Sequence, residues 1–238
     1  MISSLTILLF GFLLGMRHAL ETDHVAAVSS MATAETSILK AVRLGAVWGL
    51  GHTITLSLFG SIVILTDLFI PDHLSRGLEF VVGGMLVILG VLVIHRLIHD
   101  KVHFHVHRHA DGTMHLHAHS HAGESSHNPK LHQHEHRKFP LHALAVGMMH
   151  GMAGSAVLIL MTLQTVHSPV LSVAYMLLFG VGSILGMAVL SIIISVPLRM
   201  SAKSESLTWV NNSLCATVGS GTIILGIYKM YENGGIFL

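Results

Sequence analysis

The sequence has 238 residues, of which 52% are hydrophobic and only 11% carry a charged side chain. Soluble domains carry about 25% charged residues, so this composition, with a mean hydropathy of +0.69, excludes an ordinary soluble domain and indicates a membrane protein. The formal net charge of +1 says little about partners, and no nucleic acid is expected among them. The single cysteine, Cys215, excludes an internal disulfide and argues against a thiol redox carrier.

Six apolar runs are long enough to cross a membrane. A hydrocarbon core of about 30 Å requires about 20 helical residues, and unpaired backbone amides exclude a single strand in lipid. The sequence therefore predicts an all-α membrane protein with six transmembrane helices, at residues 2–32, 42–66, 77–98, 141–163, 169–198 and 207–230. The first run has no Lys or Arg before Arg17 and no small-residue cleavage pattern, so we do not expect a cleaved signal peptide.

The first run carries a polar cluster in its middle. Residues 16–25 read Met-Arg-His-Ala-Leu-Glu-Thr-Asp-His-Val. Charged side chains at bilayer depth are costly and usually line the pathway of an ion, a proton or a substrate. Two imidazoles beside two carboxylates predict a divalent metal site, with the candidate ligands His18, Glu21, Asp23 and His24.

The spacing of these residues leaves the position of Asp23 open. On a regular helix His18, Glu21 and His24 share one face, and Asp23 points elsewhere. Either Asp23 orients a ligating imidazole, or the helix is broken at the motif and Asp23 turns inward. Arg17 has no lone pair to offer a metal, and we expect it to pair with a motif carboxylate or to reach a loop.

Two further histidines lie inside later runs, His52 in the second and His150 in the fourth. A lone histidine in an apolar span is as often a packing residue as a ligand. Both, however, stand beside glycines, including Gly51 and Gly151, and small residues allow close helix approach and local unwinding next to a site. We therefore add both histidines to the candidate metal ligands.

The connection between the third and fourth runs, residues 100–140, is rich in histidine. Twelve histidines lie between residues 103 and 136, many at every second position. With so few apolar residues this loop is predicted to be disordered, and imidazoles at this density bind divalent transition metals with weak selectivity. We expect metal buffering by His103, His105, His107, His109, His115, His117, His119, His121, His132, His134 and His136.

The two halves of the chain resemble each other. Val82-Gly-Gly-Met-Leu-Val-Ile-Leu-Gly-Val91 aligns without gaps to Val218-Gly-Ser-Gly-Thr-Ile-Ile-Leu-Gly-Ile227, and Gly15-Met-Arg-His18 aligns to Gly147-Met-Met-His150. An odd number of crossings per unit inverts the second copy, as in many secondary transporters, whose sites lie where the repeats meet. The sequence thus predicts two inverted three-helix repeats, at residues 1–99 and 141–238, although glycine-rich apolar segments can also align by chance.

The basic residues predict the orientation in the membrane. Lys and Arg near helix ends mark the cytoplasmic face, and most of them fall in the connections after the first, third and fifth runs, while Arg76 and Lys229 fall on the other side. We therefore expect a multi-pass protein of the cytoplasmic membrane, with both termini outside and the histidine-rich loop in the cytoplasm.

Three of these motifs resemble a known family. Arg17-His-Ala-Leu-Glu-Thr-Asp-His-Val25 resembles the signature of the nickel/cobalt transporter superfamily, and Leu50-Gly-His-Thr53 resembles its second motif. His-Gly-Met-Ala-Gly-Ser at 150–155 is similar to a stretch of the urease-accessory membrane proteins, the UreH-like branch. The resemblance implies transport of Ni²⁺ or Co²⁺, with supporting roles at Thr53 and Ser155, and nickel chaperones or urease maturation proteins as cytoplasmic partners.

Glu21 is where the chain departs from the uptake branch. Uptake permeases of this superfamily carry aspartate there, whereas the exporter branch resembles this chain in having Glu, six helices and a histidine-rich loop after the third. Asp23 beside His24 favours uptake.

The sequence thus predicts a secondary permease for Ni²⁺ or Co²⁺ without a prosthetic group and without enzyme activity, with efflux as the alternative. No Walker-type phosphate loop is present. Two rivals come from other classes. A di-iron membrane enzyme would need close histidine pairs on several spans, and only the first run has one. A metal-storage protein would have the loop as its main functional part.

Overall fold

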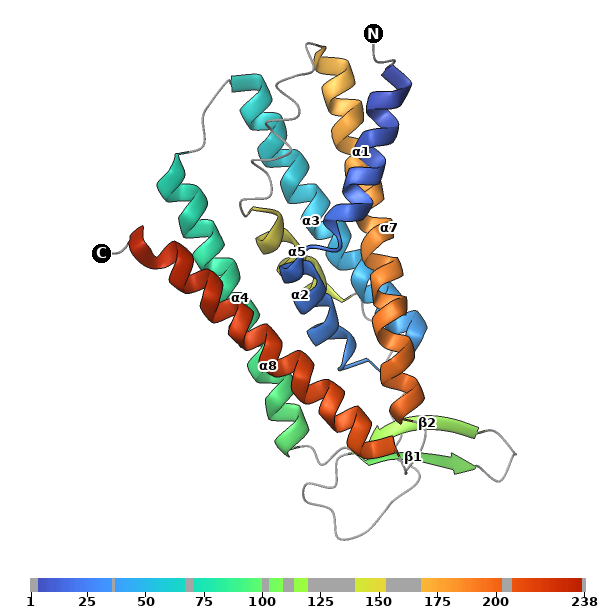
Figure 1. The fold of residues 1–238 in the computed structure, drawn as a ribbon. Coiled ribbons are helices and arrows are strands. Elements are labelled where there is room, and N and C mark those ends of the chain that lie inside the picture. The colour runs from blue at the N-terminus through green and yellow to red at the C-terminus, as the bar shows by residue number, and fades with distance from the viewer. Residues whose placement is uncertain are drawn as a thin grey trace.

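The computed structural model describes residues 4–35, 37–66, 71–99, 103–108, 114–119, 140–152, 168–202 and 207–236. These residues form helices and one short hairpin (Figure 1). In chain order the elements are α1 (Ser4–His18), α2 (Thr22–Ala32), α3 (Ile38–Thr66), α4 (Asp72–His99), β1 (His103–Arg108), β2 (Met114–His119), α5 (Leu141–Gly151), α7 (Pro169–Ala202), α8 (Thr208–Asn233) and the 3₁₀ turn η2 (Gly234–Ile236).

Three of the described helices are long and apolar enough to cross a membrane, namely Asp72–His99, Val170–Ala202 and Thr208–Asn233. A fourth span is present if α1 and α2 count as one bent crossing. The prediction of a helical membrane protein is thereby confirmed. α3 covers the predicted run 42–66 and α5 begins the run 141–163, but residues 153–163 lie outside the described part of the chain.

The first predicted run is broken at the polar motif. α1 ends at His18 with two tight backbone bonds, from Leu20 N to Arg17 O at 2.9 Å and from Glu21 N to His18 O at 3.1 Å. Glu21 then takes an extended conformation and precedes α2, which leaves the direction of α1 by 57°. The helix is therefore broken at the motif, which is one of the two arrangements that the spacing left open.

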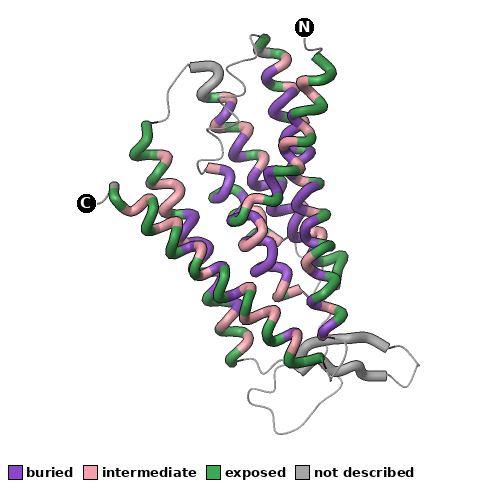
Figure 2. The backbone as a smooth tube through the Cα atoms, in the orientation of Figure 1, coloured by how far each residue is buried: buried purple, intermediate pink, exposed green. Residues whose placement is uncertain are grey.

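The two short helices α2 and α5 lie between two groups of long helices. Figure 1 shows α4 and α8 crossing on one side and α1, α3 and α7 packed together on the other. α2 contacts helices of both groups, and the buried core around it includes Val28, Trp48, Leu86 and Met187. Buried residues gather on α2, α5 and the helix faces turned toward them (Figure 2). Polar side chains at the centre of the molecule are therefore shielded from solvent, so their hydrogen-bond partners must come from the protein itself.

Glycines set the closest helix crossings. A Cβ atom at Gly15 of α1 would lie 2.0 Å from the carbonyl oxygen of Phe179 in α7, and one at Gly147 of α5 would lie 2.0 Å from the carbonyl oxygen of Trp48 in α3. α4 and α8 meet in the same way, since a Cβ at Gly83 would lie 2.8 Å from the carbonyl oxygen of Gly226. Small residues allow this backbone contact in membrane helix packing.

The histidine-rich loop is not disordered throughout, because β1 and β2 pair as an antiparallel hairpin. His105 stands opposite His117, and Val106 stands opposite Leu116. The prediction of disorder is wrong for these two segments. Histidine alternates with apolar residues in both, and the sequence between them contains Asp111-Gly112; this alternation and this dipeptide are the usual signals of a hairpin, whereas composition alone indicated disorder.

Adding a methyl group at Gly147 is expected to separate α5 from α3. The G147A substitution places the Cβ against backbone, which cannot move aside, so it should lower the stability of the detergent-solubilised protein by about 1–3 kcal/mol. The matched control is G84A, because a Cβ at Gly84 meets nothing within 4 Å. Thermal unfolding of both variants measures the difference, and equal unfolding temperatures would contradict the packing described.

Candidate metal centre

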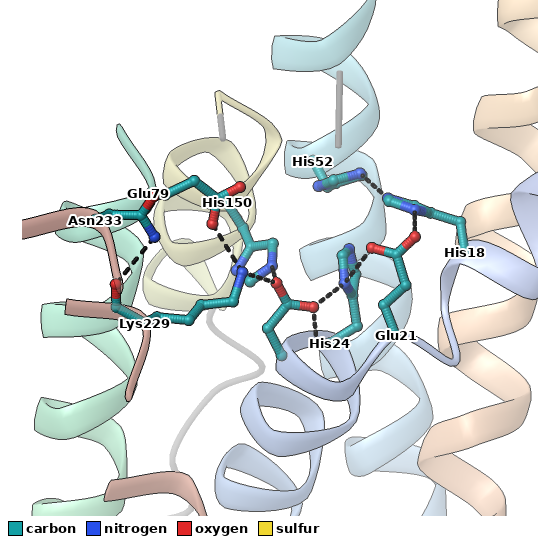
Figure 3. A network of polar contacts seen from close by, with 9 residues as sticks. His18, Glu21, His24, His52, Glu79, His150, Lys229 and Asn233 are labelled. Atoms are coloured by element: carbon teal, nitrogen blue, oxygen red, sulfur yellow. Dashed lines mark hydrogen bonds and ion pairs between the residues drawn. The ribbon is translucent and has the colours of Figure 1, made fainter. Parts of the chain in front are cut away.

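Four helices bring the polar motif residues together at the centre of the molecule. His18 ends α1, Asp23 and His24 begin α2, His52 lies within α3, and His150 lies in the last turn of α5. All five are buried, and His24 and His52 are completely inaccessible. Figure 3 shows the four histidines and Glu21 converging from these helices. The sequence placed them in separate runs, and the fold makes them one cluster.

Two sets of three ligands can be drawn in this cluster. His18, His24 and His52 each offer one nitrogen within 4.8 Å of the others. Asp23, His24 and His150 form a second set by the same measure. His24 belongs to both, with its ring centroid 4.4 Å from those of His18 and His150. The sets are therefore neighbouring positions of one centre.

The distance between two nitrogens matches that of ligands on a common metal. His18 Nε2 lies 3.1 Å from His52 Nε2. Two nitrogens bound to one ion at about 2.0–2.1 Å each stand roughly 3 Å apart at the usual ligand angles. One imidazole donates a proton to the other across this distance, and an ion bound by both nitrogens would replace that hydrogen bond.

Both motif carboxylates orient histidine rings. His18 Nδ1 donates to Glu21 Oε1 at 2.8 Å, and His24 Nδ1 donates to Asp23 Oδ1 at 2.8 Å. A carboxylate is an acceptor, so each Nδ1 carries the proton and each Nε2 keeps its lone pair. Such carboxylate–histidine contacts fix the tautomer and raise the basicity of metal-ligating imidazoles. Asp23 thus orients His24 and, because the helix is broken, also faces the centre.

Several buried nitrogens of the cluster have no hydrogen-bond partner among the described residues. They are His24 Nε2, His52 Nδ1 and both ring nitrogens of His150, although His150 Nε2 lies 3.4 Å from Asp23 Oδ2, at the distance of an ion pair. Buried polar atoms are normally paired because an unpaired one costs free energy. Lone pairs left without a donor fit a site that receives a cation.

Helix ends and aromatic rings complete the surroundings. α1 ends at His18 and α5 ends just after His150, and the carbonyl ends of helices favour cations. The Trp48 ring meets the His24 ring edge to face at 5.3 Å, and the Phe179 ring lies 5.3 Å from that of His18. These apolar rings limit the freedom of the imidazoles.

Lys229 and Glu79 also belong to the cluster, although neither is among the predicted site residues. Lys229 Nζ lies 2.8 Å from Asp23 Oδ2 and 2.7 Å from Glu79 Oε2. Figure 3 shows Lys229 reaching from α8 toward His150. Lys229 therefore pairs with carboxylates of the centre and is not the free basic residue at the outer face that its place in the sequence predicts. Both residues fall within predicted apolar runs but close to their ends, so the sequence signal for a buried role is weak.

The supporting residues take different positions. A Cβ at Gly151 would lie 2.4 Å from the carbonyl oxygen of His52, and one at Gly51 would lie 2.3 Å from that of Leu144, so both glycines bring α3 and α5 together. Thr53 Oγ1 donates to Gly180 O at 3.3 Å and thus joins α3 to α7. Arg17 is exposed and forms no ion pair with a residue that the structure describes. Ser155 lies outside the described residues.

The loop histidines fall into two groups. His103, His105 and His107 lie in β1, and His115, His117 and His119 lie in β2. The remaining candidates, His109, His121, His132, His134 and His136, lie outside the described residues.

The fold and the site together define a helical membrane protein with a buried cluster of histidine and carboxylate side chains that could hold a metal ion. The chain is 34% identical to the urease accessory protein UreH of Bacillus sp. (strain TB-90), over 97% of this chain and 92% of the relative. The chain belongs to the UreH-like family, the branch of the nickel/cobalt transporter superfamily that its motifs resemble.

Other relatives are more distant. The chloroplast proteins FOR GROWTH AND FERTILITY 1 and 2 of Arabidopsis thaliana are 25% and 21% identical over 90% of this chain, which spans 58% and 55% of their lengths. No family model and no solved structure matches the chain.

Replacing Asp23 by Asn is expected to weaken metal binding. The amide keeps an oxygen for His24 Nδ1 but loses the negative charge at Oδ2, and loss of such a partner typically costs about 10–100-fold in affinity. A titration of the purified protein with Co²⁺, followed by its visible absorption, measures the change. E232Q, at an exposed carboxylate of α8, is the control; equal affinities of D23N and E232Q would contradict the role of Asp23.

Proposed function

We propose that this protein is a secondary transporter that moves Ni²⁺, and Co²⁺ as a second cargo, across the cytoplasmic membrane. The observation that carries the proposal is the group of four buried histidines, several of whose ring nitrogens have no hydrogen-bond partner among the described residues, at the meeting point of the helices of a membrane protein. A ligand set of this kind at membrane depth would replace the hydration shell of an ion and so allow it to pass.

The chemistry of the ligands supports a divalent transition metal. Imidazole nitrogens suit nickel, cobalt and zinc, and a carboxylate oxygen is a poor ligand for a soft monovalent ion. Membership of the UreH-like family favours nickel within this group, and the relative UreH is named for an accessory role to urease. Nickel chaperones and urease maturation proteins in the cytoplasm are the proposed recipients of the ion.

The helix crossings support two inverted repeats. Gly15 of α1 packs on the Phe179 carbonyl of α7, and Gly147 of α5 packs in the same way on the Trp48 carbonyl of α3. The sequence alignment pairs Gly15 with Gly147, so equivalent residues make equivalent contacts. Gly83 with Gly226 and Gly90 with Gly219 repeat the pattern between α4 and α8. A two-fold axis relating the halves would place His18 and His150 on opposite sides of His24, as alternating access requires.

We propose uptake as the direction, with both termini outside and the histidine-rich loop in the cytoplasm. Asp23 supports uptake because the exporters of the superfamily differ at this position. Export by the same centre is the alternative, and Glu21 favours it. The nickel content of cells that express the protein separates the two, since uptake raises it above the vector control and export lowers it.

Removing a histidine of the centre should abolish nickel transport. Proteoliposomes that contain the H18A, H52A or H150A variant are expected to take up ⁶³Ni²⁺ at least about tenfold more slowly than the wild type, because each variant removes a candidate ligand. H142A, an exposed histidine of α5, is the matched control and should transport normally. Wild-type rates in all three variants would refute the assignment of the site.

Deleting residues 103–136 distinguishes transport from storage. If the loop only buffers metal at the cytoplasmic mouth, the shortened protein should keep the wild-type transport rate at saturating Ni²⁺ and should bind fewer ions per chain. The initial rate of ⁶³Ni²⁺ uptake and the bound nickel at equilibrium give the two values. A complete loss of flux, with the protein still folded in the membrane, would favour a function centred on the loop.

A further inference from the structure

Lys229 holds an ammonium group against the metal centre. Its Nζ lies 2.8 Å from Asp23 Oδ2, the same oxygen that lies 3.4 Å from His150 Nε2. The Lys229 side chain is 18% exposed and that of Asp23 is 11% exposed. The ammonium group thus contacts the Asp23 oxygen that lies nearest to His150. A metal ion bound to both Asp23 and His150 would need this same oxygen.

A metal ion and the ammonium group of Lys229 cannot both contact Asp23 Oδ2. Two cations that share one buried carboxylate oxygen repel strongly at this separation, because little water screens them. Metal binding through Asp23 Oδ2 therefore requires Lys229 to move away. Glu79 provides the place for it, since its Oε2 lies 2.7 Å from Nζ, and Lys229 can leave Asp23 while staying paired.

The charges of the group also fit an exchange of cations. Asp23 and Glu79 both pair with the ammonium of Lys229, and a third carboxylate, Glu21, contacts His18 in the same centre. With neutral histidines the group carries two formal negative charges, which a divalent cation neutralises. When the ion leaves, Lys229 again pairs with Asp23. The buried carboxylate therefore keeps a partner, because an unpaired buried charge would be strongly destabilising.

We propose that Lys229 is an internal competitor of the transported ion. It occupies Asp23 in the ion-free protein, moves to Glu79 when the ion binds, and returns to displace the ion. The inference rests on the proposed metal centre and adds to it a residue that lowers affinity so that the ion can be released. Lys229 is a positioning residue in this scheme, because it acts through Asp23 and does not touch the metal.

Removal of the competitor should tighten metal binding. Isothermal titration of the full-length protein in detergent with Ni²⁺ is expected to give an affinity for K229Q at least about fivefold higher than for the wild type, within the range usual for coupled sites. K229R keeps a cation and should show a smaller gain. K40Q, at an exposed lysine of α3, is the matched control and should equal the wild type.

Glu79 gives a second variant with the opposite sign. In E79Q, Lys229 has lost its alternative partner and pairs with Asp23 alone, so Ni²⁺ binding should weaken. If the Lys229 ion pairs only held the helices together, K229Q and E79Q would break the same contact and change affinity in the same direction. The contrast between the two variants therefore distinguishes competition from structural support, and E79Q still tests the proposal if K229Q does not fold.

The possible results separate this inference from the proposed function. If H18A binds fewer Ni²⁺ ions per chain than the wild type and K229Q binds no more tightly than the wild type, the competitor role is refuted and the transport site stands. If the wild type does not bind Ni²⁺, both are refuted.

Discussion

The buried carboxylate of Asp23 is the group on which the centre of this protein depends. A charge of this kind in a membrane protein costs several kcal/mol unless it is paired, and Asp23 is paired with groups from three helices: His24 of its own helix α2, His150 of α5 and Lys229 of α8. Lys229 extends the contact to Glu79 of α4. A single anion therefore joins α2, α5 and α8 at one point, and a cation that bound there would change how they are held.

The broken first span is what brings this carboxylate inside. On a continuous helix Asp23 would point away from His18 and His24, but the turn after His18 lets α2 start in a new direction. α2 is then fixed against α8 by the hydroxyl contact of Ser30 with Thr222 at 2.9 Å. Without the break in the first span, the Asp23 carboxylate would not lie among the imidazoles of the centre.

The sequence predicted the parts of the site that depend on local spacing and missed those that depend on helix crossings. His18, Glu21 and His24 could be found because they lie three residues apart, and His52 and His150 because glycines flank them. Gly15 and Gly147, aligned from sequence, do make matching contacts. Lys229 and Glu79 could not be found in this way, because each stands near the end of an apolar run, where contact with water is the simpler interpretation. Lys229 and Glu79 are 150 residues apart in the sequence, and they pair because α8 crosses α4 with Gly226 against Gly83. The hydrophobic pattern of the sequence does not predict how these two helices cross.

The shared histidine limits the proposed centre to one ion at a time. His24 is a member of both ligand sets, and its Nδ1 is committed to Asp23, so one nitrogen remains for either set. Two divalent ions on neighbouring ligands would also repel each other with little screening. An ion held by His18, His24 and His52 can therefore reach the set of Asp23, His24 and His150 only by exchanging the other ligands around His24. In the proposed transport such an exchange would carry the ion from His18 toward His150, and the ion would meet Lys229 only on the side of Asp23 and His150, where competition for Asp23 would favour its release.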